Sequence, residues 1–350
     1  MTSDVPNLRF PEFQEEWEEY RIEDITVNIS SGRCKSHSSN GKYNLYGSTG
    51  IIGKTDEACY EGNLVLVARV GANAGFLQII NEPCGITDNT LIIKPKEVDV
   101  QYIYYFLQHF NLNRLIFGSG QPLITGGMLK KVKVSLGTIQ EQNKITRLLS
   151  ILDERITTQN KIIDKLQSLI KGLRVRLIQI ENGNIVHLGE IARIYLPQTI
   201  SSTELTEDGF LVYGANGIIG KYKEYNHKTE QICITCRGNT CGMVNYTKPM
   251  SWITGNAMVI NTDEHQNKVC KRYLYHYLSA YNFNSLISGS GQPQIVRTPL
   301  EQLKVTLPTF LEQKQKATFL DKIQGKIEIS NKTLNLYLQQ KQYLVRQMFI

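Results

Sequence analysis

The chain has 350 residues, which is enough for two or three domains with separate cores. Hydrophobic residues make up 41% and charged residues 20% of it, as in ordinary globular proteins, and no apolar run is long enough to span a membrane. No secretory signal opens the sequence and the seven cysteines form no dense framework, so we expect reduced thiols in a cytoplasm. The net charge of +7 suits a polyanionic partner, but it equally suits a protein that binds no polyanion.

The sequence contains an internal duplication, because short segments of the first half return in the second half in the same order. The pairs are Tyr46–Lys54 and Tyr213–Lys221, Arg69–Gly75 and Arg237–Gly242, Ile86–Asn89 and Ile253–Asn256, and Gly118–Pro122 and Gly289–Pro293. The first pair is related by a shift of 167 residues and the last by a shift of 171, and Arg237–Gly242 is one residue shorter than its counterpart. We therefore expect two homologous domains that have diverged between these segments.

Each half predicts the same elements in chain order. Runs rich in Val, Ile and Tyr between Gly- and Asn-rich turns predict strands, and aromatic residues at helical spacing predict one helix per half. The strands are Asn63–Ala68, Thr90–Lys94 and Lys131–Leu136, then Gln231–Cys236, Ala257–Ile260 and Gln302–Leu307; the helices are Tyr102–Phe110 and Tyr273–Tyr281. This pattern indicates an α+β fold with an irregular, turn-rich sheet.

A long helix is predicted after each domain. Thr138-x-x-Glu141 and Thr309-x-x-Glu312 have the spacing of capping boxes, which predicts that the helices begin there. Downstream, mostly apolar residues recur at alternating steps of four and three, as in the seam of a coiled coil. The predicted seam residues are Ile145, Leu149, Leu152, Ile156, Gln159, Ile163, Leu166, Ile170, Leu173 and Leu177 in the first helix and Leu320, Ile323, Ile327, Ser330, Leu334, Tyr337 and Leu344 in the second. The polar residues Gln159 and Ser330 hold matching positions and are either register-fixing residues or tolerated defects.

Each helix alone would expose an apolar stripe, so we expect the two to form an antiparallel coiled coil, roughly 60 Å long at ~1.5 Å per residue. The predicted organisation is a pseudo-two-fold repeat with two tandem globular domains and two long helices. The boundaries are residues 1–138 for the first domain, 139–181 for the first spacer helix, 182–309 for the second domain and 310–350 for the second spacer helix.

One segment superficially matches a phosphate-binding loop. Gly47 and Gly53 precede Lys54 and Thr55, but five residues separate the two glycines where that motif has four. In the second half Tyr222 replaces the hydroxyl residue that would bind the metal. The segment therefore predicts a turn.

Three cysteines of the second half suggest a zinc site, but the repeat favours core packing for them. The sequence aligns Cys233, Cys236 and Cys241 with Val65, Ala68 and Ala74. The chain also lacks the Asn/Asp-Pro-Pro-aromatic motif of adenine methyltransferases, and no histidine keeps its place in both halves. We expect no catalytic residue, no metal and no cofactor in this chain.

The opening segment Leu8-Arg9-Phe10-Pro11-Glu12-Phe13, with Trp17-Glu18 and Ile22-x-Asp24-Ile25, resembles the start of type I restriction-modification specificity subunits. The duplicated Tyr-Gly-x-x-Gly-Ile-Ile-Gly and Gly-Ser-Gly-Gln-Pro segments are similar to that family too, as are the helix starts Glu141-Gln142 and Glu312-Gln313. The resemblance covers essentially the whole chain. The second half has no counterpart of Trp17 and keeps only Leu188-x-Glu190-Ile191.

This resemblance implies two target-recognition domains that each read one half of a bipartite, asymmetric double-stranded DNA sequence. It implies partners as well: two adenine-N6 methyltransferase (M) subunits that dock on the helices, and ATP-driven restriction (R) subunits, in a bacterial cytoplasm and away from membranes. S-adenosylmethionine, ATP and magnesium would then bind those partners. Two rival interpretations are a coiled-coil protein-interaction scaffold and a degenerate methyltransferase or nuclease fused to a DNA reader.

Candidate DNA-binding residues are of two kinds. Turn and polar residues of the repeated segments are Lys54, Arg69, Asn73, Asn89, Ser119, Gln121, Asn216, Lys221, Arg237, Asn239, Asn256, Ser290 and Gln292. Cations of the diverged stretches are Arg33, Lys35, Lys42, Arg114, Lys223, Lys248 and Arg297. The alternative is that the repeated residues hold the shared fold while the base readers lie in the diverged stretches.

Overall fold

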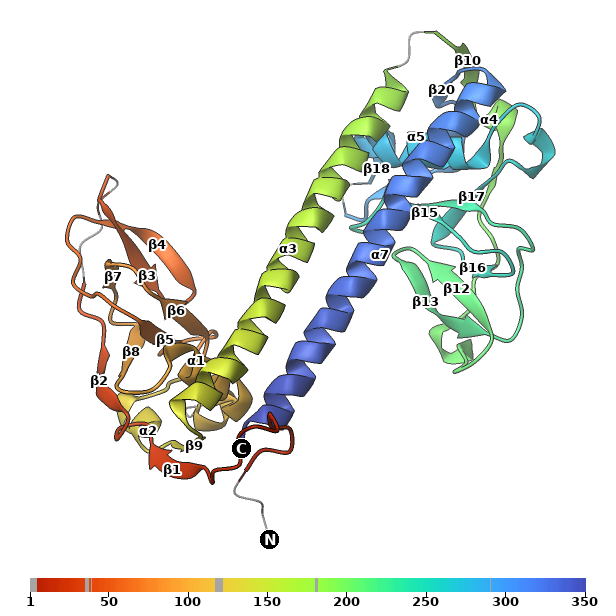
Figure 1. Ribbon diagram of the computed structural model, residues 1–350. Coiled ribbons are helices and arrows are strands. Elements are labelled where there is room, and N and C mark those ends of the chain that lie inside the picture. Colours follow the sequence, from red (N-terminus) through yellow and green to blue (C-terminus); the bar gives the residue numbers. More distant parts are fainter. Residues whose placement is uncertain (1–4, 35–37, 39, 117–121, 180–181, 290) are drawn as a thin grey trace. The chain divides into compact units, whose positions relative to one another are not determined.

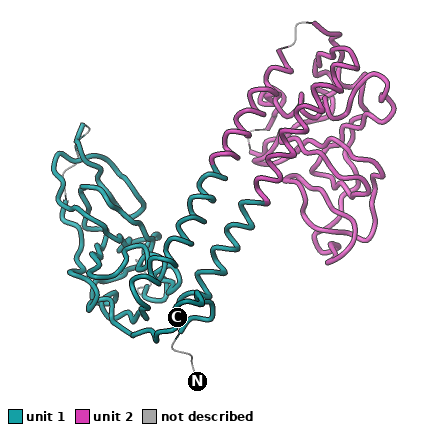
Figure 2. The backbone as a smooth tube through the Cα atoms, viewed as in Figure 1, with its two compact units in different colours: residues 1–160, 333–350 teal, residues 161–332 magenta. Residues whose placement is uncertain are grey.

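The computed structural model describes residues 5–34, 38, 40–116, 122–179, 182–289 and 291–350 (Figure 1). The chain divides into two compact units (Figure 2). Unit 1 combines residues 1–160 with 333–350, and unit 2 is the continuous stretch 161–332. Within the described residues, no helix is both long and apolar enough to cross a membrane.

The described strands of unit 1 form three small sheets. β1 (Glu18–Arg21) pairs with β9 (Lys133–Leu136) in antiparallel register. A four-stranded sheet has the order β2 (Thr26–Ser31), β8 (Thr90–Pro95), β5 (Leu64–Ala68) and β6 (Leu77–Ile80), and a three-stranded sheet has the order β4 (Gly50–Thr55), β3 (Tyr43–Gly47) and β7 (Cys84–Ile86). The helices are α1 (Val100–Phe110), the 3-10 turn η1 (Leu112–Leu115) and α2 (Gly126–Lys130).

Unit 2 repeats this plan. β10 (Asn184–His187) pairs with β20 (Lys304–Leu307). A four-stranded sheet has the order β11 (Arg193–Tyr195), β17 (Ala257–Asn261), β14 (Ile232–Thr235) and β15 (Val244–Tyr246). A three-stranded sheet has the order β13 (Gly217–Tyr222), β12 (Phe210–Gly214) and β16 (Trp252–Ile253). It adds a two-stranded pair, β18 (Ile287–Ser288) and β19 (Gln294–Ile295). The helices are α4 (Leu188–Ile191), α5 (Lys271–Ala280), α6 (Arg297–Glu301) and the 3-10 turns η2 (Ser202–Glu204), η3 (Asp263–His265) and η4 (Phe283–Leu286).

Both predicted helices and the predicted strands are present, with shifted ends. The final strand of each unit begins two residues later than predicted, because Lys131 and Gln302 cap the short helices α2 and α6 instead. The aromatic residues of α1 and α5 enter the cores as their spacing predicts. The Tyr102 hydroxyl donates to the Ser135 carbonyl at 2.9 Å and the Tyr273 hydroxyl to Thr306 at 3.1 Å, so both buried phenols are satisfied.

The two long helices are α3 (Ile139–Ile178) and α7 (Phe310–Met348), and they pair in antiparallel fashion. In unit 1 the Lys341 ammonium lies 2.6 Å from Asp153, and in unit 2 Arg174 donates to Gln324 at 3.4 Å, so later residues of α3 meet earlier residues of α7. Each predicted seam residue is buried or partly buried. The structure adds Ala317 and Val345 to the buried residues of α7; Ala317 precedes the first predicted seam residue, Leu320, and Val345 directly follows the last, Leu344.

The first capping box differs from the prediction. Thr309 and Glu312 form the complete reciprocal box, in which the Glu312 carboxylate accepts the Thr309 N–H at 3.0 Å. At the other helix the Thr138 hydroxyl accepts the Glu141 N–H at 3.3 Å, but the Glu141 carboxylate turns away from the cap. It accepts Arg9 at 2.7 and 2.9 Å and the Trp17 indole N–H at 3.0 Å. Since Glu141 is fully buried, its charge needs a cation more than the helix needs a second cap.

The neighbouring glutamines have a shared structural role. Gln142 is buried, donates to the Gly137 carbonyl at 2.9 Å and accepts the Asp99 N–H at 3.3 Å. Gln313 makes the same contacts with Pro308 at 3.0 Å and Cys270 at 2.8 Å. Each glutamine thus ties the start of a long helix to the residue just before α1 or α5, which explains why glutamine recurs at this position in both halves.

A buried histidine joins α5 to both long helices in unit 2. The His276 side chain is fully buried, its Nδ1 lies 3.1 Å from the Arg174 Nε–H and its Nε2 lies 2.8 Å from Asp321. A neutral ring with its proton on Nε2 satisfies both contacts. Burial lowers the pKa of His276, and Arg174 adds to the effect against the pull of Asp321. Partial burial acts to raise the pKa of Asp321, but hydrogen bonds from His276 and Arg272 outweigh it and hold that pKa at about 2.

We predict that Arg9→Ala lowers the free energy of unfolding by about 3 kcal/mol, because it leaves the Glu141 carboxylate buried without its cation. Chemical denaturation monitored by circular dichroism measures the change. In the double variant Arg9→Ala with Glu141→Gln, part of that loss should be regained, since no buried charge remains. Strict additivity of the two single changes would contradict the coupling.

We also predict a loss of stability below neutral pH. A histidine whose pKa is lower in the folded state leaves the unfolded chain with more bound protons, so stability falls as the pH drops below about 6.5. The depressed pKa of Asp321 adds a further loss between about pH 4 and pH 2. Melting temperatures at about pH 7.5 and about pH 5.5 should differ less in His276→Gln, whose amide keeps a donor and an acceptor but does not titrate. Equal differences in the two proteins would show that His276 does not carry the effect.

Candidate DNA interface

The repeated segments of the first half meet in one place in unit 1. The Thr87 N–H donates to Tyr46 O at 3.0 Å, Arg69 N–H to Asn89 O at 2.8 Å and Gly71 N–H to Pro122 O at 3.0 Å. These bonds join the β3–β4 tip, the turn after β5, the turn before β8 and the segment 122–124. We call these parts the loop cluster of unit 1. Segments far apart in the sequence are therefore held together by backbone hydrogen bonds, whatever their side chains are.

Unit 2 has an equivalent loop cluster made of the β12–β13 tip, the turn after β14, the turn before β17 and the segment 293–295. Thr254 N–H donates to Tyr213 O at 3.0 Å, Cys236 N–H to Asn256 O at 3.2 Å and Gly238 N–H to Pro293 O at 3.0 Å. The hairpin between Tyr46 and Lys54, which superficially matched a phosphate-binding loop, is the tip of β3 and β4 in unit 1.

These matching bonds correct the alignment of the two halves. Arg69 and Cys236 donate to equivalent carbonyls, so Arg69 corresponds to Cys236 and not to Arg237. Arg237 corresponds to Val70, because Val70 bridges Leu123 where Arg237 bridges Gln294. The shift of 167 residues thus persists through Gly242, and no residue is missing from the second turn. The shared arginine had drawn the sequence alignment out of register by one residue.

The cysteines shift with this correction. By strand pairing Cys233 corresponds to Leu66, since they face Val259 and Ile92 in matching positions, and Cys236 corresponds to Arg69. Cys241 keeps Ala74 as its counterpart. Cys233 and Cys236 are nevertheless buried in the core, and burial raises the pKa of both thiols. In the parts of the chain that are described, no His, Cys, Asp or Glu side chains gather as a metal-binding group.

Equivalent glycines fix the turns after β5 and β14. Gly75 and Gly242 both have the left-handed backbone conformation, with φ of 88° and 91°. A Cβ atom on either would lie 3.2 Å from the Cβ of Leu112 or Phe283. The repeated glycines therefore maintain the shared frame of the two loop clusters.

The candidate residues of unit 1 are only partly brought together. Arg69, half-buried, and the exposed Asn73 and Asn89 belong to its loop cluster. Three other candidate cations contact neighbouring side chains. Lys54 donates to Asn44 at 2.8 Å, Lys42 lies over the Tyr43 ring, and Arg114 lies over the Phe110 ring. Arg33 is exposed. Lys35, Ser119 and Gln121 lie outside the described residues.

In unit 2 the loop cluster contains the exposed residues Asn216, Arg237, Asn239 and Asn256, and Gln292 immediately precedes it. Three cations outside it have acidic neighbours: Lys221 with Asp208 at 3.1 Å, Lys223 with Glu224 at 3.9 Å and Arg297 with Glu301 at 2.7 Å. Lys248 is exposed, and its backbone N–H donates to the Tyr213 hydroxyl at 3.1 Å. Ser290 lies outside the described residues.

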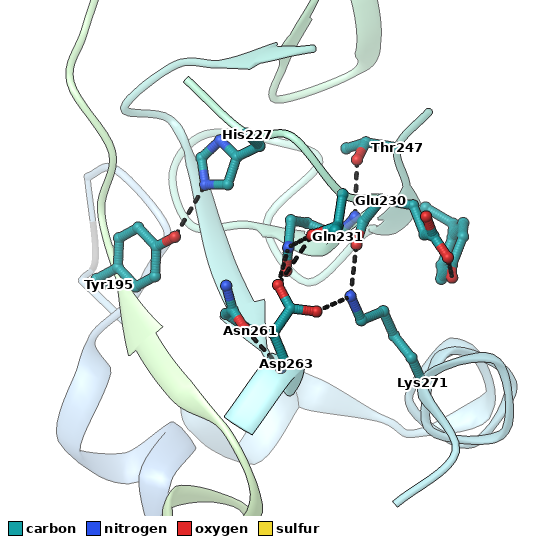
Figure 3. A network of polar contacts seen from close by, with 10 residues as sticks. Tyr195, His227, Glu230, Gln231, Thr247, Asn261, Asp263 and Lys271 are labelled. Atoms are coloured by element: carbon teal, nitrogen blue, oxygen red, sulfur yellow. Dashed lines mark hydrogen bonds and ion pairs between the residues drawn. The ribbon is translucent and has the colours of Figure 1, made fainter. Parts of the chain in front are cut away.

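Unit 2 contains a network of polar contacts that the sequence did not predict (Figure 3). Asp263 accepts Lys271 at 2.6 Å and the buried Gln231 amide at 2.9 Å, and hydrogen bonds from these groups outweigh its burial and lower its pKa. Lys271 also donates to the Glu230 carbonyl at 2.6 Å, and the Tyr195 hydroxyl contacts His227 at 2.9 Å. The network anchors α5 to the start of β14, so we assign it a structural role. The residues are scattered in sequence and have no repeated spacing, which is why no motif reveals them.

Comparison with known proteins agrees with this arrangement. Residues 14–168 and 181–338 both match the type I restriction modification DNA specificity domain. The chain belongs to this family. It is the DNA specificity subunit of a type I restriction-modification system, a non-catalytic subunit that carries no cofactor of its own.

Individual relatives support the family assignment, over nearly the whole chain in one case and over a shorter stretch in another. The type I restriction enzyme MjaVIII specificity subunit of Methanocaldococcus jannaschii is 25% identical, with 94% of this chain and 90% of that protein covered. The EcoprrI specificity subunit of Escherichia coli is 33% identical over a shorter stretch, 39% of this chain and 34% of that protein. The fold is similar to the crystal structure of the S subunit from M. genitalium, with a TM-score of 0.78, 19% identity and 99% of both chains covered.

Proposed function

We propose that each loop cluster reads one half of a bipartite, asymmetric DNA target, and that α3 and α7 set the distance between the halves. The observation that carries this proposal is the combination of one hydrogen-bonded frame with different side chains in its two copies. Identical frames approach DNA in the same way, and different side chains on them select different bases. The readers would belong to the domains 1–138 and 182–309, and the spacer to 139–181 and 310–350.

Two readers linked by one spacer would not each need to bind DNA tightly. A second half-site becomes an intramolecular partner once the first is bound, but only when its separation fits. The paired helices suit a spacer because α3 is one continuous helix that supplies residues to both units. An adenine must leave the duplex before it can be methylated. The pocket that receives the flipped adenine can therefore lie on a partner subunit and not on this chain.

Two methyltransferase subunits and the restriction subunits are the partners we propose for the helices. Outside the seam, the helices keep several large apolar side chains at least 39% exposed. They are Ile151, Leu336, Leu338 and Tyr343 in unit 1 and Ile162, Leu169, Val175 and Phe319 in unit 2. Contiguous apolar patches mark protein-binding surfaces, and a partner docked along the helices would bury these side chains. S-adenosylmethionine, ATP and magnesium would be bound by these partners.

The DNA-reading proposal predicts steep salt dependence. The complex with its methyltransferase partner should lose at least ten-fold in affinity for target duplex between about 50 and 200 mM salt, because counterions are released from the phosphates. Fluorescence anisotropy measures this. A flat salt response would favour the protein-interaction scaffold, and methylation or cleavage by the purified chain alone would favour the degenerate enzyme.

The spacer proposal predicts a change in the target itself. One heptad inserted after Asn160 and one after Lys332 lengthens both helices at the boundary of the units and keeps the seam in phase. The half-sites should move apart by roughly three base pairs, since seven residues add about 10 Å. Sequencing of methylated DNA from a host carrying the variant and its partner reads the spacing.

Four residues inserted between Arg155 and Lys161 in α3 alone break the phase and should abolish assembly. An unchanged spacing with full methylation in the double-heptad variant would disprove the spacer role.

A further inference from the structure

One pair of facing residues changes its chemistry completely between the two loop clusters. In unit 1 Val70 and Leu123 form an isolated antiparallel bridge, and in unit 2 Arg237 and Gln294 form the same bridge. We call these four residues the cross-loop pairs. The Gln294 position follows the Gly-Ser-Gly-Gln-Pro segment and matches Leu123 by the shift of 171 residues, but the sequence alone had not paired it with Arg237.

The backbone around the two cross-loop pairs is held in the same way. On one side Gly71 donates to Pro122 and Gly238 to Pro293, both at 3.0 Å. On the other side Ile124 donates to Arg69 at 2.9 Å and Ile295 to Cys236 at 3.0 Å. Because bonds flank the bridge on both sides, its side chains leave the frame from equivalent positions in the two units.

The side chains of the second pair are free to meet a ligand. Arg237 and Gln294 are both exposed, and within the described residues neither side chain has a hydrogen-bond or ion-pair partner. The neighbouring Arg297, by contrast, is engaged by Glu301 at 2.7 Å. Val70 and Leu123 are half-buried and present an apolar surface at the same place.

The switch from cation to hydrocarbon argues for contact with bases and not with phosphates. Every half-site presents the same phosphates, so a phosphate-binding position would keep its cation in both copies. Base edges differ: arginine donates two hydrogen bonds to the O6 and N7 of guanine, glutamine accepts from the N6 amino group of adenine and donates to its N7, and apolar side chains contact the thymine methyl.

We propose that the cross-loop pairs read bases in the major groove, and that they set one difference between the two half-sites. Arg237 reads a guanine in the half-site of unit 2, with Gln294 beside it on the next base, and Val70 with Leu123 contacts a thymine methyl in the other. This inference rests on the proposed function, in which each loop cluster meets one half-site.

The test exchanges the pairs. The double variant Arg237→Val with Gln294→Leu carries the chemistry of unit 1 in unit 2. Arg193→Ala serves as the matched control, because it removes an exposed arginine that pairs with Asn261, at the end of β17 away from the loop cluster. Each is produced with its methyltransferase partner, and the methylated motif of the host DNA is sequenced. We expect the exchange to change or relax a guanine and its neighbour in one half-site, while the other half-site and the control motif stay as in the wild type.

Binding measurements identify the type of contact. Wild-type complex should bind duplex with the guanine replaced about ten- to hundred-fold more weakly, and Arg237→Val should lose that discrimination. Arg237→Lys keeps the charge without the bidentate geometry, so it should keep the salt dependence and still lose discrimination. Melting temperatures of the variants show whether they are folded. Because the substituted residues are exposed, we expect these temperatures to match that of the wild type.

Three results would overturn the inference: an unchanged motif in the exchange variant, equal loss at both half-sites, or weaker binding to all sequences with a smaller salt slope, which is the behaviour of a phosphate contact. A wild-type complex that methylates no bipartite motif would instead refute the proposed function from which the inference starts.

Discussion

Burial of the apolar seam between α3 and α7 is the constraint on which the rest of this protein depends. A helix that exposed such a stripe to water would forgo about 25 cal/mol for each Å² left unburied. In unit 1 the seam joins Ile145 and Leu149 to Val345 and Met348, and in unit 2 it joins Ile170 and Leu177 to Leu320 and Ile323. Since the two helices come from the middle and the last part of the sequence, satisfying the seam forces the chain to return to its first unit. The globular part of each unit is then attached to helices that are already paired.

Within each unit, the backbone holds the loop cluster together, and the proposed function leaves recognition to the exposed side chains. Backbone N–H and C=O groups join the loops to one another, and glycines provide the turn conformations, so the frame places few demands on exposed side chains. The bridge between residues 70 and 123 shows the result, because hydrocarbon side chains in one unit are replaced by Arg237 and Gln294 in the other without a change in the flanking bonds. If the proposed function holds, a change of exposed side chains could give a new DNA target while the backbone of the loop cluster stays the same.

Much of this architecture could be predicted from the sequence. Buried strands such as β5 and β14 are continuous apolar runs, α1 and α5 show aromatic residues at helical spacing, and threonine caps mark the starts of α3 and α7. Short strands such as β1 and β10 were not predicted, because they are largely exposed and have no apolar period. The role of Glu141 was also hidden, since a capping glutamate and a buried ion-paired glutamate occupy the same position in sequence.

The candidate site was less predictable than the fold. The repeat identified which segments matter, but their convergence depends on hydrogen bonds between residues as distant as Gly71 and Pro122. Because Arg69 and Arg237 are the same residue type, the sequence alignment paired them. Their hydrogen-bond and bridge partners instead pair Arg69 with Cys236 and Val70 with Arg237. Positions that differ between copies, such as Val70 and Arg237, leave no repeated pattern, so a search for repeated residues passes over them.

The composition of unit 1 also determines when each part of the protein can fold. Phe349 packs on Tyr102, with ring centroids 5.0 Å apart, and the Leu8 N–H donates to Gln347 O at 2.9 Å. Unit 2 is one continuous stretch of chain and is complete once residue 332 has left the ribosome. Most of unit 1 is synthesised before unit 2, yet its core stays open until residues 333–350 emerge. The order of completion during translation is therefore the reverse of the order in the gene, and a truncated chain would lose its first unit before its second.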